Sequence, residues 1–168
     1  MPRAILIGPP GAGKSTVARA LSKRLNVLFA DTDQLIEERA GKKITEIFIE
    51  DGEARFRELE EEIVAEQLSS AEGILALGGG AVMSARTQIL LAAHLEKVIF
   101  LEVSISQAAP RVGFNKERPL LAINPRQQWQ ALYEKRLPIY QRLAGFSIST
   151  DSKKPQEVAD EIAKYLGE

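Results

Sequence analysis

Residues 8–16, with the sequence GPPGAGKST, have the residue types and the spacing of a phosphate-binding loop. They match the pattern G-x-x-x-x-G-K-[ST], in which Lys14 and Ser15 fill the last two positions. Glycines let successive backbone N–H groups turn toward phosphate oxygens, and the N-terminus of a following helix adds partial positive charge. In such a loop the lysine reaches the β- and γ-phosphates and the hydroxyl binds Mg²⁺. We therefore expect ATP and Mg²⁺ here, with ATP contacts from Gly11, Ala12, Gly13, Lys14, Ser15 and Thr16.

Two carboxylates stand one residue apart in the stretch FADTD, residues 29–33. In an extended chain Asp31 and Asp33 point to the same side. Two adjacent like charges cost free energy unless a cation or a proton lies close to them. Beside a Mg²⁺·ATP site, one acid can belong to the metal shell and the other can face the acceptor hydroxyl. The alternative is a structural role, in which one of these residues caps a helix that starts near Gln34.

Composition excludes several other classes of function. The 168 residues suffice for one domain, and a net charge of −1 lacks the basic excess of a nucleic-acid-binding protein. With no cysteine and a single histidine, His94, disulfides, thiolate metal sites and multi-histidine sites are excluded. No signal peptide is visible, and no apolar run approaches the roughly 20 residues that span a bilayer. We expect a cytoplasmic monomer without nucleic-acid or membrane partners.

Short apolar runs alternate with helical patterns, as is typical of a parallel sheet with crossover helices. Because a strand precedes the glycine loop and a helix follows it, a nucleotide site is favoured over a ligand-free glycine turn. The predicted fold is α/β, with three α/β/α layers and a five-stranded parallel sheet. The expected strands are 4–7, 27–31, 73–80 (running into a glycine loop), 97–103 and 146–150. The expected helices are 15–25, 33–40, 44–50, 53–68, 84–94, 104–112, 125–142 (bent or interrupted before Pro138) and 155–166, with 113–124 irregular.

Six motifs in a fixed order resemble those of the shikimate kinase family. They are the phosphate loop, DTD, FRELE (56–60), LGGGAV (77–82), RPLL (118–121) and KRLPIY (135–140). The resemblance implies a P-loop fold of the nucleoside-monophosphate kinase type and transfer of the γ-phosphoryl group of ATP to the 3-hydroxyl of shikimate. This reaction lies in the pathway to chorismate and aromatic amino acids. The resemblance also implies one kinase domain over 1–168, with its P-loop at 8–16, a substrate-binding region at about 31–62 and a lid at about 111–124.

On the substrate side, the resemblance implies that Arg57 and Arg136 bind the carboxylate of shikimate. A guanidinium fork suits a carboxylate in a way that an ammonium group cannot reproduce. From the residues alone, Arg55 is an equal candidate, and either arginine could be a solvated charge on an acidic helix. The family match favours Arg57, with Glu60 holding it in place.

The resemblance also places the backbone of Gly79 and Gly80 against the ring, since only glycine lets a ring press onto the backbone. It makes Asp31 a magnesium residue together with Ser15, and Asp33 the acid that faces the acceptor. Whether Asp33 acts as a base or as an orienting group stays open.

On the nucleotide side, the resemblance implies that Arg118 reaches the phosphates when the lid closes and is catalytic with Lys14 and Asp33. Arg111 and Lys153 are expected near the adenine, although many family members have an arginine at the second position. An exposed basic loop is the alternative for both arginines. Trp129 and Tyr133 are interpreted as packing residues.

A nucleoside-monophosphate kinase is disfavoured, because the chain lacks an obvious base-recognition segment and a long insert lid. Two other functions are compatible with a P-loop in a chain of this size. One is phosphorylation of another small metabolite, as in gluconate kinase, which does not need DTD, FRxxE and GGGAV together. The other is a P-loop module that binds nucleotide without catalysis. The simultaneous presence of Lys14, Ser15, Asp31, Asp33 and Arg118 argues against such a module.

Overall fold

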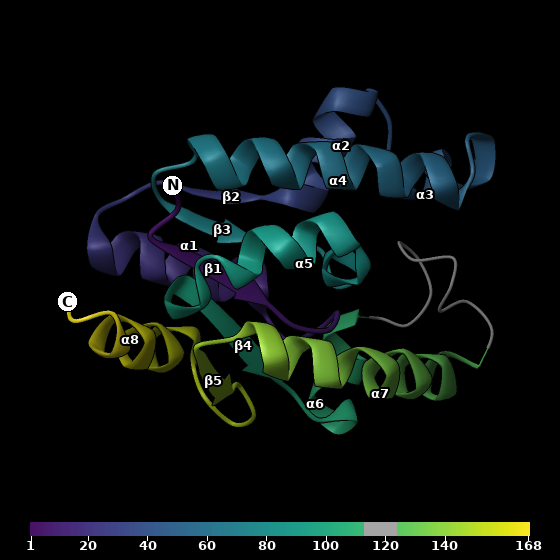
Figure 1. Ribbon diagram of the computed structural model, residues 1–168. Helices are drawn as coiled ribbons and strands as arrows, with labels where there is room; N and C mark the ends of the chain where they lie inside the picture. The colour runs from purple at the N-terminus through teal and green to yellow at the C-terminus, as the bar shows by residue number, and fades with distance from the viewer. Residues whose placement is uncertain (113–123) are drawn as a thin grey trace.

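The central element of the fold is a sheet of five parallel strands in the order β2-β3-β1-β4-β5 (Figure 1). The computed structural model describes residues 1–112 and 124–168. Leu6 in β1 pairs with Ala76 on one side and Ile99 on the other, which fixes the register of the three central strands. The strands are β1 Ala4–Ile7, β2 Phe29–Asp31, β3 Ile74–Ala76, β4 Val98–Glu102 and β5 Phe146–Ser149.

Helices cover both faces of this sheet, so the predicted three-layer α/β/α architecture is confirmed (Figure 1). The helices are α1 Lys14–Leu25, α2 Thr32–Ala40, α3 Ile44–Glu50, α4 Glu53–Ser70, α5 Ala85–Ala92, α6 Ile105–Val112, α7 Pro125–Leu143 and α8 Pro155–Tyr165. Two short 3₁₀ helices, η1 Ala81–Met83 and η2 Leu95–Lys97, complete the described elements.

Strand β1 shows how the sequence builds the layers. Its residues alternate between two clusters: Ala4 and Leu6 pack with α1 and α8, whereas Ile5 and Ile7 pack with α4, α5 and α7. All four are at most 1% exposed, as expected for a central strand covered on both faces. Burying each large apolar side chain contributes about 1.5–3 kcal/mol. A third cluster joins α2, α3 and α4, which carry the substrate-binding region predicted from the sequence.

Three local predictions differ from the structure. The second strand starts at Phe29 instead of residue 27, and the third ends at Ala76, before the glycine loop. Helix α7 is continuous across Pro138, where an interruption was one of the expected outcomes. Tyr140 and Leu143, beyond the proline, are buried in the core, so packing outweighs the lost backbone hydrogen bond. In the described parts of the chain, no helix is long and apolar enough to cross a membrane.

Candidate active site at the carboxyl ends of the strands

The phosphate loop, residues 8–16, lies between the end of β1 and the start of α1, as predicted. Gly11 and Gly13 have φ values of +84° and +91°, the left-handed region that glycine enters without steric cost. The ammonium group of Lys14 donates to the carbonyl oxygens of Gly8 at 2.7 Å and Pro9 at 3.0 Å. The loop therefore curls around its own lysine, and the N-terminus of α1 opens beneath it.

Asp31 connects the loop to the second strand through both of its carboxylate oxygens. The hydroxyl of Ser15 donates to Oδ2, and the backbone N–H of Asp33 donates to Oδ1 at 2.9 Å. Asp31 is thus the N-cap of α2, so the capping alternative is correct for this residue. Capping uses only one oxygen, and the other stays beside a hydroxyl of the phosphate loop.

The oxygen pair of Ser15 and Asp31 fits a magnesium ion. Mg²⁺ prefers hard oxygen ligands and is usually held by one or two protein groups together with substrate phosphates and water. Among residues 1–112 and 124–168, no group of three or more His, Cys, Asp or Glu could hold a metal by itself. A magnesium ion at Ser15 and Asp31 would therefore take its further ligands from other oxygens, such as those of phosphate and water.

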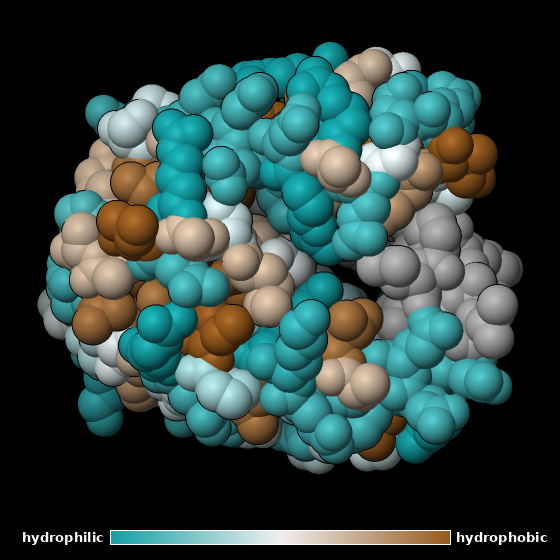
Figure 2. Space-filling view, turned by 45° about the vertical axis from the view of Figure 1, so that its right-hand side comes forward, coloured by the Kyte–Doolittle hydropathy of each residue, from teal (hydrophilic) through white to brown (hydrophobic). Residues whose placement is uncertain are grey.

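A cavity of about 360 Å³ joins the phosphate loop to both acids. The carboxyl ends of the strands face the right-hand side of Figure 1, and Figure 2 turns this side forward. In this view the surface is hollowed between the upper part of the molecule and α7 below. The lining residues are Pro10, Gly11, Gly13, Lys14, Ser15, Thr16, Asp31, Asp33, Leu77, Arg111 and Val112.

The glycine loop after β3 lies directly against two guanidinium groups. A Cβ atom built on Gly80 would be 2.7 Å from both terminal nitrogens of Arg57 and 3.0 Å from one of Arg136. A Cβ atom on Gly79 would be 3.4 Å from Arg136 and 2.9 Å from the ring of Pro10. The two predicted substrate arginines, which are far apart in the sequence, therefore converge on the predicted substrate glycines.

Arg57 and not Arg55 reaches this loop. Arg57 donates to the buried carboxylate of Glu60 at 2.6 Å, as predicted, and lies 3.7 Å from Glu53. Arg55 pairs with Glu58 at 3.1 Å, and its side chain is 48% exposed. The solvated-charge alternative therefore describes Arg55.

Two carboxylates contact the same glycine loop, residues 78–80, as the two arginines do. A Cβ atom on Gly78 would be 2.6 Å from Oδ1 of Asp33 and 3.0 Å from Oε2 of Glu60. Arg136 is only 7% exposed, so its charge is held in a largely desolvated setting where electrostatic interactions are strong. The site thus offers two cationic forks and an acid within one small region, which suits a ligand with both a carboxylate and hydroxyl groups.

A second cavity, of about 300 Å³, also borders the phosphate loop and is lined by both predicted adenine residues. Arg111 donates to the carbonyl of Gly11 at 3.0 Å and to Oγ1 of Thr150 at 3.4 Å. Lys153 forms an ion pair with Glu161 at 3.2 Å. Arg118, predicted to act on the phosphates, lies outside the described residues. The cavity is lined by Ala12, Gly13, Thr16, Val17, Arg111, Thr150, Lys153, Pro155 and Val158.

Helix α7 carries two polar contacts to the site that sequence reasoning missed. The indole N–H of Trp129 donates to the carbonyl of Pro10 at 2.9 Å, and the hydroxyl of Tyr140 donates to the carbonyl of Gly79 at 2.5 Å. Both side chains are at most 2% exposed. The signal was present in the residue types, because a buried Trp or Tyr usually finds a partner for its polar group. Trp129 therefore packs, as predicted, but also holds the phosphate loop.

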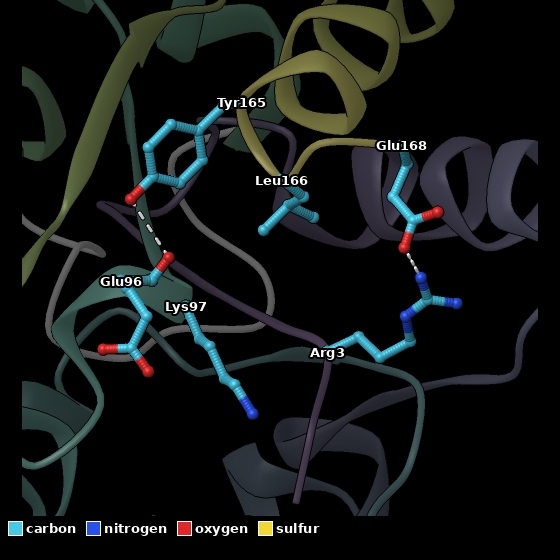
Figure 3. A pocket seen from close by; sticks show the side chains of 6 residues that line it. All are labelled: Arg3, Glu96, Lys97, Tyr165, Leu166 and Glu168. Carbon is cyan, nitrogen blue, oxygen red and sulfur yellow. Dashed lines mark hydrogen bonds and ion pairs between the residues drawn. The ribbon is translucent and has the colours of Figure 1, made fainter.

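A larger hollow, of about 450 Å³, lies at the opposite end of the sheet (Figure 3). Arg3 and Lys97 immediately precede β1 and β4, so this hollow faces the amino ends of the strands. Arg3 pairs with Glu168, and the hydroxyl of Tyr165 donates to the carbonyl of Glu96 at 3.0 Å. These groups satisfy one another and lie far from the phosphate loop, so the smaller cavity at the carboxyl ends is the candidate active site.

Comparisons with known proteins show which proteins this chain resembles. A family model described as shikimate kinase matches residues 10–167. A shikimate kinase of Thermobifida fusca is 54% identical over 98% of this chain and 95% of its own length. The structure of shikimate kinase from Acinetobacter baumannii in complex with shikimate has a TM-score of 0.92, with 34% identity over 99% of this chain and 93% of its own. A gluconokinase from Sinorhizobium meliloti shares only the fold, with a TM-score of 0.55 and 18% identity over 98% of this chain and 91% of its own.

Proposed function

Because this chain belongs to the shikimate kinase family, we propose that its carboxyl-end site transfers the γ-phosphoryl group of ATP to the 3-hydroxyl of shikimate. The reaction serves the pathway to chorismate and aromatic amino acids. The observation that supports these roles for the site most strongly is the convergence of Arg57, Arg136 and Asp33 on the glycine loop beside the P-loop.

On the acceptor side, Arg57 and Arg136 bind the carboxylate of shikimate with their planar forks. The backbone of Gly79 and Gly80 supports the ring. A Cβ atom on Gly80 would collide with Arg57, and one on Gly79 would collide with the ring of Pro10. Asp33 binds a ring hydroxyl and orients it toward the phosphate loop, or accepts its proton during transfer. Glu60 keeps Arg57 pointed at the loop through their 2.6 Å contact.

On the nucleotide side, Lys14 exchanges the carbonyls of Gly8 and Pro9 for the β- and γ-phosphates of ATP. Backbone N–H groups of Gly11 to Thr16 surround the phosphates, and Arg111 and Lys153 flank the adenine. Arg118 supplies positive charge to the transferring group from a lid over about 111–124. Phosphoryl transfer depends mainly on such positioning and charge stabilisation.

Ser15 and Asp31 hold Mg²⁺ in this proposal, and the ion neutralises charge on the phosphates when it is bound. Replacing Asp31 by Asn tests the role separately from capping, because Asn is an equally good N-cap. We expect the Mg²⁺ concentration for half-maximal activity to rise about tenfold, by analogy with weakened metal sites, while the melting temperature stays near wild type. An unchanged Mg²⁺ dependence would leave Asp31 with its capping role alone.

Acceptor dependence tests the function as a whole. ADP release from Mg²⁺·ATP should require shikimate and should not be stimulated by gluconate. The 54% identity to a shikimate kinase, against 18% to the gluconokinase, favours shikimate over gluconate. A binding module without catalysis would release no ADP with any acceptor.

The remaining expectations are that the protein is a monomer, that it is cytoplasmic and that the substrate-binding region covers about 31–62. The packing of α2, α3 and α4 into a cluster of their own supports the last of these. Light scattering of the purified protein measures its oligomeric state, and cell fractionation measures its location. Hydrogen exchange with and without shikimate maps the substrate-binding region.

A further inference from the structure

The peptide group between Gly79 and Gly80 is held by a buried phenol. The hydroxyl of Tyr140 donates to the carbonyl oxygen of Gly79 at 2.5 Å. Tyr140 is 0% exposed, and its ring stacks on Phe100 of β4 with the ring centroids 5.0 Å apart. A side chain fixed in this way by the core presents its hydroxyl in one position. The carbonyl of Gly79 is therefore tied to the rigid sheet.

Fixing this carbonyl also fixes the direction of the next N–H group. The peptide is trans, so its C=O and N–H point in opposite directions, and the N–H of Gly80 points away from Tyr140. The preceding peptide is fixed separately, because the carbonyl of Gly78 accepts from the N–H of Ala81 at 3.1 Å. Within the described parts of the chain, no hydrogen bond engages the N–H groups of Gly79 and Gly80.

Two oriented N–H groups therefore stand beside the two guanidinium forks. Arg136 lies on the same helix as Tyr140, just over one turn earlier, and contacts the same glycine loop. Helix α7 thus supplies a cation to this region and also sets the direction of a backbone donor within it. A donor that is already oriented loses less entropy when it binds an oxygen of the substrate.

We propose that Tyr140 is a positioning residue for shikimate, which acts by orienting the Gly79–Gly80 peptide so that its N–H faces the substrate. The inference rests on the proposed function, since it assigns a role within the same acceptor site. Without the phenol hydroxyl, the carbonyl of Gly79 is buried without its partner, and the peptide can rotate to satisfy it elsewhere. The N–H of Gly80 then loses its fixed direction.

The test is Tyr140→Phe, which keeps the ring on Phe100 and removes only the hydroxyl. We expect KM for shikimate to rise about tenfold, the effect of one misdirected hydrogen bond, while KM for ATP stays within twofold. The matched control is Tyr133→Phe on the same helix, whose half-buried ring packs on Trp129 with the ring centroids 4.9 Å apart. Both variants lose a buried or half-buried phenol, so both should melt at a lower temperature. Only Tyr140→Phe should raise KM for shikimate.

Equal kinetic parameters for the two variants would overturn the proposal, because Tyr140 would then contribute only to stability. The same holds if KM for ATP and KM for shikimate rise together. A second measurement needs no variant: ¹⁵N NMR of the wild-type protein without substrate should show one sharp amide resonance for Gly80. A doubled or exchange-broadened Gly80 resonance would mean that the peptide is not oriented in advance, and would also overturn it. If wild type fails to phosphorylate shikimate at all, the proposed function fails, whereas this resonance still tests the orientation.

Discussion

Replacing Asp33 by Asn is expected to lower kcat for shikimate phosphorylation by about 10²–10⁴, the usual contribution of a general base. The substitution keeps the size of the side chain and removes its charge and its ability to accept a proton. The backbone N–H of Asp33 still donates to Asp31, so the cap of α2 is preserved. Loss of a charge from the first helical turn should cost only about 0.3–1 kcal/mol of stability.

The matched control for this experiment is Asp51→Asn. Asp51 belongs to the same substrate-binding region, but it pairs with Lys42 at 2.7 Å, away from the glycine loop. Initial rates of ADP release, measured with both substrates saturating, should be unchanged in this control. If Asp33→Asn retained more than a third of the wild-type kcat, Asp33 would not be the proton acceptor, because Asn can still accept a hydrogen bond but cannot take the proton.

Replacing Gly80 by Ala is expected to raise KM for shikimate by about 100-fold, because the new methyl group takes the place of two charged hydrogen-bond donors. Its Cβ atom would lie 2.7 Å from two nitrogens of Arg57 and 3.0 Å from one of Arg136. Both contacts are with the ends of flexible side chains, so the arginines can move aside. The substrate carboxylate then loses both forks.

The folded state should tolerate this change well. Gly80 has φ −94° and ψ −1°, a conformation open to alanine, so no backbone strain is introduced. We expect a melting temperature close to that of wild type and an unchanged KM for ATP, as measured by thermal unfolding and steady-state kinetics. A KM for shikimate within threefold of wild type would show that the arginines do not need their present positions beside Gly80.

Local patterns in the sequence were enough to predict the phosphate loop and most elements. Continuous apolar runs predicted the bounds of β1 and β4 almost to the residue, because a strand buried on both faces must be apolar throughout. The choice between Arg55 and Arg57 needed more than spacing. Both lie on one acidic helix, and only the packing of α4 decides which of them faces the glycine loop.

The contacts that were missed join residues far apart in the chain. Trp129 and Pro10 are 119 positions apart, and Tyr140 and Gly79 are 61 apart. No local pattern in the sequence predicts such a hydrogen bond, because it forms only when α7 packs against the sheet. The continuity of α7 across Pro138 has the same origin, since the local rule for proline is outweighed by tertiary packing. The role of Arg118 stays a prediction, because this residue lies outside the described ones.

The central claim is that this site phosphorylates shikimate, and the most direct measurement is the rate of ADP formation from Mg²⁺·ATP by the wild-type protein. The acceptors to compare are shikimate, gluconate, AMP and none. We predict rapid ADP release with shikimate alone, with the phosphate found on the 3-hydroxyl of the product by NMR. Stimulation by gluconate or AMP but not by shikimate would contradict the account, and the arginine pocket would then have to bind a different ligand. No stimulation by any acceptor would also contradict it and would favour a P-loop module that binds nucleotide without catalysis.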